Sequence, residues 1–234
     1  MTTALIELTL WTAIFATAKT NMIGGFGKES YLAYVLWTAF VGRIAANWMY
    51  EFKMADEIES GSINSILVRP TSFYGSYLSQ FLGYKFIVSG FSLVFPLLAS
   101  YWFHLPLISL RILPALALIV YYLILMHTIS FVIATLAFHL TRIHSITVAK
   151  NLALWLVTGE LIPLDLFPEG IRQVVLWLPF SSGVYIPVAY LTGRISEDLL
   201  YRGFLSTTLG IIFFGAVGAM MWRWGLTKYT GTGA

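Results

Sequence analysis

The 234-residue chain is 58% hydrophobic and only 11% charged, with a formal net charge of +3 and no cysteine. A soluble domain is about 25% charged, so this composition excludes an ordinary water-facing surface and indicates a membrane protein. It also argues against nucleic-acid binding, which needs a concentrated basic face, and it excludes disulfides and thiol chemistry.

Six apolar runs predict six membrane-spanning helices, because a spanning helix needs about 20 mostly apolar residues. We expect the spans at about 4–23, 31–50, 81–103, 112–138, 146–162 and 204–224. The alternation typical of barrel strands is absent. No cleavable signal peptide is expected, since residues 1–3 carry no Lys or Arg and Glu7 interrupts the first run. The sequence therefore predicts an all-α membrane protein in which residues 1–234 form one transmembrane domain.

The first connection, "GGFGKES" at 24–30, is similar to the end of a phosphate-binding loop. The full pattern needs Gly, four residues and then Gly-Lys-Ser/Thr, but Met22 stands at its first position and Glu29 follows Lys28. We interpret this stretch as a turn between spans one and two. The chain thus shows no nucleotide site of its own.

A few charged or polar residues lie inside the predicted spans. Arg43 is a candidate contact for a substrate or partner, and an ion pair with Glu7 or Glu160 is the alternative. For His127 we favour a hydrogen bond to a neighbouring helix over a direct functional role.

The polar segment at 51–80 lies between spans two and three. Its apolar residues recur at roughly helical spacing, which predicts one or two short amphipathic helices. Pro70 disfavours helix at Arg69, so the chain should turn there. A helix lying flat on the membrane is the alternative, but such helices are usually basic. Because this segment is acidic, we favour a protein partner.

The second irregular region opens with "GELIPLDLFPEG" at 159–170. Pro163 and Pro168 should break the helix and free carbonyl groups that lipid cannot satisfy. We expect Asp165 and Glu169 at a water-accessible interface, with Asp165 capping the helix that begins near Pro168 or Ile171. We favour a structural role for these acids over substrate binding.

No catalytic or metal-binding pattern is found in the sequence. His139 and His144 are five apart and do not share a helical face as a metal pair would. No G-x-S-x-G occurs, and no nucleophile has a base nearby. Gly215 and Ala219 form a small-xxx-small pair, but such residues are common in membrane helices, and this interpretation is favoured over a dimer contact. We therefore expect no catalytic residue, no metal and no cofactor in this chain.

Two blocks resemble the type 2 ATP-binding-cassette (ABC) exporter permeases. "IESGSINSILVRPTSFYGSYL" is similar to the family's segment after span two, "I..G.L...L.RP", although Ile63 stands where Leu is common. The stretch from Gly159 to Gly193 is similar to "SG.LIPLDLFP..L......LPF....Y.P...L.G", with Thr158 in place of Ser.

The resemblance implies a cytoplasmic coupling helix between spans two and three that docks into a separate ATPase. The residues implied in coupling are Asp56, Glu57, Glu59, Gly61, Ile63, Leu67, Arg69 and Pro70. It also implies a re-entrant helical hairpin at 163–202, between spans five and six. The residues implied in shaping it are Gly159, Pro163, Asp165, Phe167, Pro168, Pro179, Phe180 and Pro187.

The expected function is that of the permease subunit of an ABC exporter. Its mostly apolar spans suit lipid-like, glycan or hydrophobic substrates. The expected partners are two ATPase copies carrying ATP and Mg, a second permease copy or paralogue, and membrane lipids, with no nucleic acid. Lys and Arg in the link after span four and in the tail favour cytoplasmic termini, in a bacterial inner or plasma membrane. A six-span secondary carrier or channel is the alternative, but carriers tend to show internal repeats, and none is found.

Overall fold

The computed structural model describes residues 2–17, 22–23, 26–47, 50–140 and 142–229, apart from the side chains of residues 2–5 and 7. Helices dominate this part of the chain. In the first half the elements are α1 (Thr2–Thr17), β1 (Met22–Ile23), β2 (Phe26–Gly27), α2 (Lys28–Ala45), α3 (Tyr50–Glu59), α4 (Asn64–Leu67) and α5 (Phe73–Trp102). In the second half they are η1 (Ser109–Arg111), α6 (Ile112–Thr135), η2 (Leu136–Phe138), α7 (His144–Val157), η3 (Leu164–Leu166), α8 (Glu169–Trp177), η4 (Pro179–Gly183), α9 (Tyr185–Leu191) and α10 (Glu197–Lys228).

Three helical stretches of the described residues are long and apolar enough to cross a membrane, namely α5, the run Ser109–Phe138 and α10. Each has at least 30 residues, which is about 45 Å at 1.5 Å per residue. α6 is mostly buried and packs along α10. α5 and α10 instead expose large apolar side chains such as Phe86, Phe91 and Phe213. In a chain of this composition, such faces are suited to lipid.

Three of the predicted spans are shorter in the structure. α1 has 16 residues, α2 has 18 and α7 has 14, so α7 is only about 21 Å long against a hydrocarbon core of about 30 Å. Span two was predicted to reach residue 50, but α2 ends at Ala45. The count of six crossings therefore stays a prediction.

The sequence predicted that Pro163 would end the helix that precedes it, and the structure differs. α7 ends at Val157, and Gly159 follows with a φ of 78°. This left-handed conformation is open to glycine at little cost. The chain therefore leaves the helical path before it reaches Pro163.

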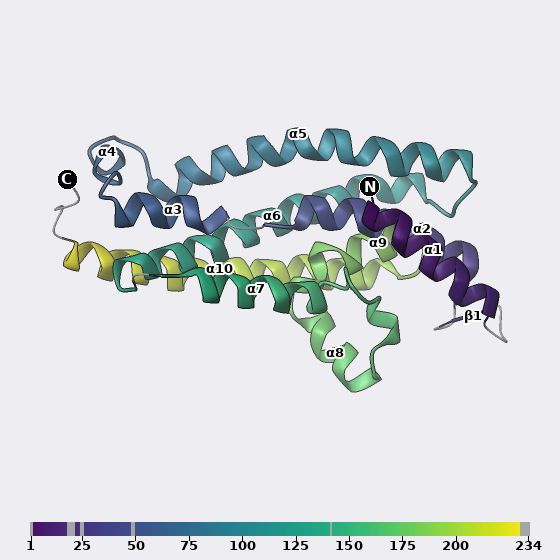
Figure 1. The fold of residues 1–234 in the computed structure, drawn as a ribbon. Helices are drawn as coiled ribbons and strands as arrows, with labels where there is room; N and C mark the ends of the chain where they lie inside the picture. Colours follow the sequence, from purple (N-terminus) through teal and green to yellow (C-terminus); the bar gives the residue numbers. More distant parts are fainter. Residues whose placement is uncertain (1, 18–21, 24–25, 48–49, 141, 230–234) are drawn as a thin grey trace.

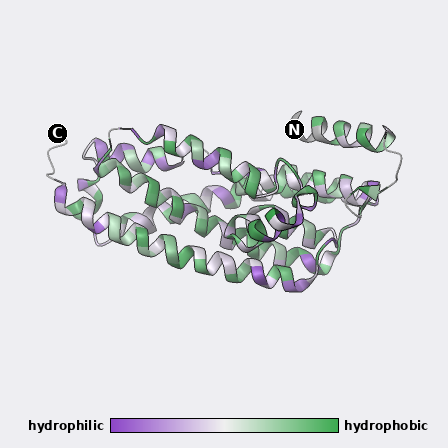
Figure 2. Ribbon diagram, turned by 90° about the horizontal axis from the view of Figure 1, so that it is seen from below, coloured by the Kyte–Doolittle hydropathy of each residue, from purple (hydrophilic) through white to green (hydrophobic). Residues whose placement is uncertain are grey.

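The elements form an elongated bundle with two distinct ends (Figure 1). One end holds α3, α4, the start of α5 and the end of α10, whereas α1 and the β1–β2 hairpin lie toward the other. Figure 2 shows hydrophobic residues over much of the helix surface and more frequent hydrophilic residues near the α3–α4 end. β1 and β2 pair through Ile23 and Phe26. The turn predicted at "GGFGKES" begins with Gly24 and Gly25, which lie outside the described residues.

Candidate functional site

The apolar face of the 51–80 segment is covered by the chain itself. Met54, Ile58 and Ile63 are buried and pack with residues of α5 and α6, including Phe131. Gly61 is also buried, with a φ of 78°. Ile63, which the resemblance implies in coupling, thus lies in the interior of this chain, because helical periodicity shows an apolar face but not what covers it.

The remaining side chains of this segment form an exposed surface at the end of the bundle. Asp56 and Glu59 are exposed on α3, whereas Glu57 is half-buried beside Tyr77. Leu67 and Val68 are exposed although apolar, at 42% and 84%. We define the α3–α4 surface by its exposed residues Asp56, Glu59, Leu67, Val68, Arg69 and Pro70.

The junction between α2 and α3 is held by a lysine from α5. The Lys85 ammonium donates hydrogen bonds to the carbonyls of Ile44, at 2.7 Å, and Ala46. The last carbonyls of a helix lack intrahelical partners and carry partial negative charge. Lys85 thus satisfies the broken end of α2 where the predicted second span would have continued.

A buried ion pair lies beside this junction. Lys150 of α7 contacts Glu51 of α3 at 2.6 Å, and the Glu51 side chain is fully buried. Ser130 of α6 donates to Glu51 at 3.3 Å and accepts from the Asn47 side chain at 2.7 Å. This network joins α3, α6 and α7. The sequence offered one signal for it, since a cation in an apolar helix requires a partner.

Arg43 and Glu160 are not brought together as a pair. Arg43 is exposed on the side of α2 that meets α5, where it lines a pocket with Lys85 and Tyr84. Glu160 packs against Gly42, where a Cβ added to the glycine would lie 2.7 Å from the Glu160 carboxyl carbon. Within the described residues no ion pair involves Arg43, and the Glu7 side chain lies outside them.

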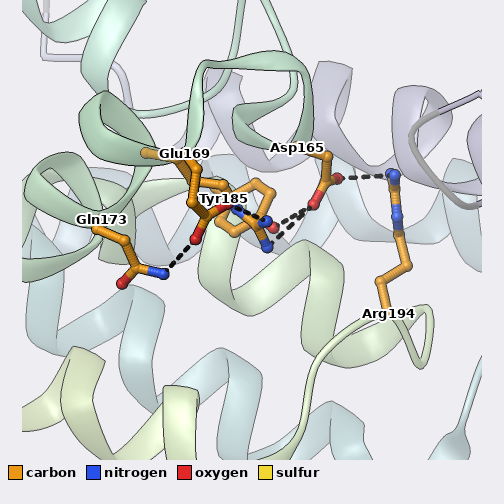
Figure 3. Close-up of polar contacts among 6 residues, drawn as sticks. Asp165, Glu169, Gln173, Tyr185 and Arg194 are labelled. Carbon is orange, nitrogen blue, oxygen red and sulfur yellow. Dashed lines mark hydrogen bonds and ion pairs between the residues drawn. The ribbon is translucent and has the colours of Figure 1, made fainter.

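Asp165 lies at the centre of the second irregular region (Figure 3). It accepts a hydrogen bond from the Tyr185 hydroxyl at 2.6 Å and pairs with Arg194 at 2.7 Å. A second guanidinium, that of Arg172, lies 3.7 Å away. Burial, followed by the charge of Asp165, raises the pKa of Tyr185, so the phenol stays a proton donor. We call these four residues the Asp165 junction.

The expectation that Asp165 caps α8 at a water-accessible interface is wrong. Its side chain is only 4% exposed, and α8 has no side-chain cap at its first residue. The carboxylate is held instead by one hydrogen bond from the Tyr185 phenol and by the charges of two guanidinium groups, those of Arg194 and Arg172. Glu169 does lie in the open, where it accepts a hydrogen bond from Gln173 at 2.6 Å (Figure 3).

Arg194 ties the junction to the start of α2. Its guanidinium lies 4.0 Å from the centre of the Phe26 ring, with the Tyr31 and Tyr34 rings at 4.6 and 4.7 Å. The Tyr34 hydroxyl donates to the Gly159 carbonyl at 3.0 Å. Gly159 has no room for a side chain, because a Cβ there would lie 2.9 Å from the Cβ of Tyr185.

The other residues of this region have mainly packing positions. Pro168 directly precedes α8, Pro179 begins η4, and Pro187 is buried in the first turn of α9. Phe167 and Phe180 are partly buried against the main core. α9 is buried throughout. The hairpin thus has a buried return helix and a more exposed α8.

In the described part of the chain, His127, His139 and His144 contact the backbone or the aromatic rings of other helices. His127 contacts the Tyr74 carbonyl of α5 at 3.1 Å, which confirms the predicted contact between helices. His139 lies against the Trp224 ring, and His144 stacks on Phe52. No group of residues that could hold a metal ion was found among the described residues.

Gly215 and Ala219 line a groove of about 520 Å³ between α5 and α10. Open space surrounds Gly215, with no atom within 4 Å of a Cβ placed there. The pair therefore does not bring two helices of this chain together.

The described residues form an α-helical membrane protein in which buried polar contacts join the helices. A family model described as an ABC-2 family transporter protein matches residues 1–233, and the chain belongs to this family. Neither the curated proteins nor the solved structures contain a match. Members of this family are permease components of ABC transporters and normally work with an ATPase subunit. Membership of this family decides for an ABC permease over the alternative of a carrier or channel without an ATPase.

Proposed function

We propose that the chain is the permease subunit of an exporter for a lipid-like, glycan or hydrophobic substrate. A separate ATPase docks on the α3–α4 surface, and two ATPase copies bind ATP and Mg in a complex with a second permease copy or paralogue. The observation that carries this proposal is the exposure of Asp56, Glu59, Leu67 and Val68 at the end of the bundle. Acidic and apolar groups together suit a protein partner better than an anionic membrane surface.

The contacts beneath the α3–α4 surface connect α3 to α6 and α7. Ile58 and Ile63 pack against the cluster that contains Phe131 of α6, and Glu51 is paired with Lys150 of α7. A shift of α3 imposed by the ATPase therefore moves α6 and α7 with it. ATP binding would act by favouring one of two conformations that contact the ATPase differently.

The 163–202 region is proposed as a re-entrant hairpin in the outer leaflet. Ile171, Val174 and Trp177 of α8 are each more than half exposed, although all three are apolar. The same helix carries Glu169 and Arg172. An amphipathic helix with an exposed apolar side is suited to the membrane interface.

We further propose six crossings, with the α3–α4 end and both termini on the cytoplasmic side of a bacterial inner or plasma membrane. The end of α10, with Lys228, lies at the same end of the bundle as α4 (Figure 1). Six crossings would place Arg111 and Arg194 on the outer side, and both have partners within the chain, since Arg194 pairs with Asp165 and Arg111 donates to the Tyr190 carbonyl. Their positions therefore need not weigh against this orientation.

The test is co-purification with the partner ATPase subunit, co-expressed with this chain. Replacing Asp56 and Glu59 together by lysine should abolish co-purification and the stimulation of ATPase activity, because both charges reverse on an exposed surface. The matched control reverses Glu29 and Asp198, which are exposed in the first turns of α2 and α10. If the folded Asp56/Glu59 variant retained the complex and its activity as the control does, the docking assignment would be wrong.

A further inference from the structure

A cationic pocket opens where the end of α2 and the start of α3 meet α5. Its volume is about 260 Å³, and its walls include Arg43 and Lys85 together with the rings of Tyr50, Phe81 and Tyr84. No acidic residue lines it within the described part of the chain. The pocket therefore presents two positive groups without a carboxylate.

Both cations have donors to offer. Arg43 is exposed and takes part in none of the ion pairs of the described residues. A guanidinium has five N–H donors in a planar fork that fits phosphate oxygens in pairs. Lys85 uses two donors on the carbonyls of Ile44 and Ala46. Its ammonium has three, so one N–H remains.

These cations lie at a depth along the bundle where a positive charge needs a partner, so the lack of a carboxylate in the pocket points to a bound anion. Lys85 lies about 18 Å along α5 from Phe73, counting 1.5 Å per residue. In a helix of about 45 Å this is well inside a hydrocarbon layer of about 30 Å. Cations at such depth are costly and usually have partners. Lys150 has Glu51, whereas Arg43 faces an open pocket.

An apolar path leads away from the pocket. Tyr84, Val88, Phe91 and Phe95 follow one another at helical spacing along α5. Tyr84 and Phe91 are 64% and 81% exposed, and Phe95 stacks on Phe40 of α2. A molecule with its anion in the pocket would thus find an apolar surface for its remainder.

We propose that this pocket binds an anion of the phosphate class, carried by an amphiphile whose apolar part lies along α5. The assignment of this amphiphile as cargo rests on the transport function proposed above, whereas the binding site itself does not. Arg43 supplies the paired donors, and Lys85 supplies the third contact from the wall of the pocket.

The test measures binding to the purified full chain in detergent, without an ATPase. The probes are dihexanoyl phosphatidic acid, dihexanoyl phosphatidylcholine and inorganic phosphate, each titrated while thermal unfolding is followed. We expect phosphatidic acid to stabilise the wild type, and Arg43→Gln to weaken its binding by about tenfold or more. Arg43→Lys should recover part of the affinity. Arg223→Gln, on the exposed end of α10, is the matched control and should bind as the wild type does.

The two anionic probes distinguish the source of the anion. Binding of phosphatidic acid without binding of inorganic phosphate supports an amphiphile, and equal affinity for both overturns that part of the proposal in favour of a free anion. Equal affinity for phosphatidic acid and phosphatidylcholine, whose headgroup adds a cation, also counts against it.

Val88→Trp keeps the proposal testable if Arg43→Gln does not fold. This change fills the pocket from α5 without removing a charge, and it should reduce binding as well. Unchanged affinity in the folded variants would overturn the site. So would a changed oligomeric state of Arg43→Gln with unchanged affinity, because Arg43 would then belong to a subunit contact. Loss of ATPase docking would instead affect the proposed function and leave this binding assay unchanged.

Discussion

Replacing Asp165 by asparagine should destabilise the fold strongly, because it removes the charge that Arg194 faces inside the protein. Both side chains are almost fully buried, at 4% and 1% exposed, and their ionic groups are 2.7 Å apart. Removing one partner of a buried ion pair costs about 3–5 kcal/mol, since the other charge stays buried. A protein of this length changes its melting temperature by about 2–4 °C per kcal/mol. We therefore expect Asp165→Asn to melt roughly 6–20 °C below the wild type.

The assay is thermal unfolding of the purified chain in one detergent, with Arg194→Met alone and two further variants. Glu169→Gln removes a neighbouring carboxylate that is 68% exposed, and its melting temperature should stay close to that of the wild type. Asp165→Asn combined with Arg194→Met removes both charges and should recover part of the loss. If Asp165→Asn melted with the wild type, or if the double variant were worse than the single changes combined, the junction would not be held by this pair.

Two further substitutions test what stabilises the ends of helices α7 and α2. Gly159→Ala should lower the free energy of unfolding by at least about 1–2 kcal/mol, because alanine is strained in the left-handed conformation. The control, Gly170→Ala, has open space around it and should not lower the melting temperature. Equal effects of the two changes would contradict the role given to Gly159. Lys85→Met should lower the free energy of unfolding by about 1–3 kcal/mol for each carbonyl at the end of α2 that it leaves without a partner. The control, Lys28→Met, changes an exposed position and should leave the stability unchanged. A Lys85→Met variant as stable as the wild type would show that the end of α2 does not need the ammonium.

The sequence predicted the helical class of this protein because composition and apolar run length are local properties. The run at 112–138 predicted the Ser109–Phe138 helix closely, and the long apolar stretches around 81–103 and 204–224 lie within α5 and α10. The effect of Pro70 was also local, since α4 ends at Leu67, before Arg69. The two blocks of family resemblance agree with the match over residues 1–233.

Helix ends inside apolar runs were not predicted, because distant residues stabilise them. Nothing near Ala45 in the sequence indicates the end of α2, and its carbonyls are satisfied by Lys85, about 40 positions away. Gly159 was part of the recognised block, but its left-handed conformation depends on packing against Tyr34 and Tyr185.

By itself, the sequence determined a lipid-suited helical chain, an acidic amphipathic segment after the second apolar run and an irregular region rich in proline. Only the tertiary structure decided that Ile63 faces inward, that Asp165 pairs with Arg194 and that Glu51 pairs with Lys150. The physical reason is that periodicity and composition act over a few residues, whereas a buried charge takes whichever opposite charge the packing of the helices brings within reach.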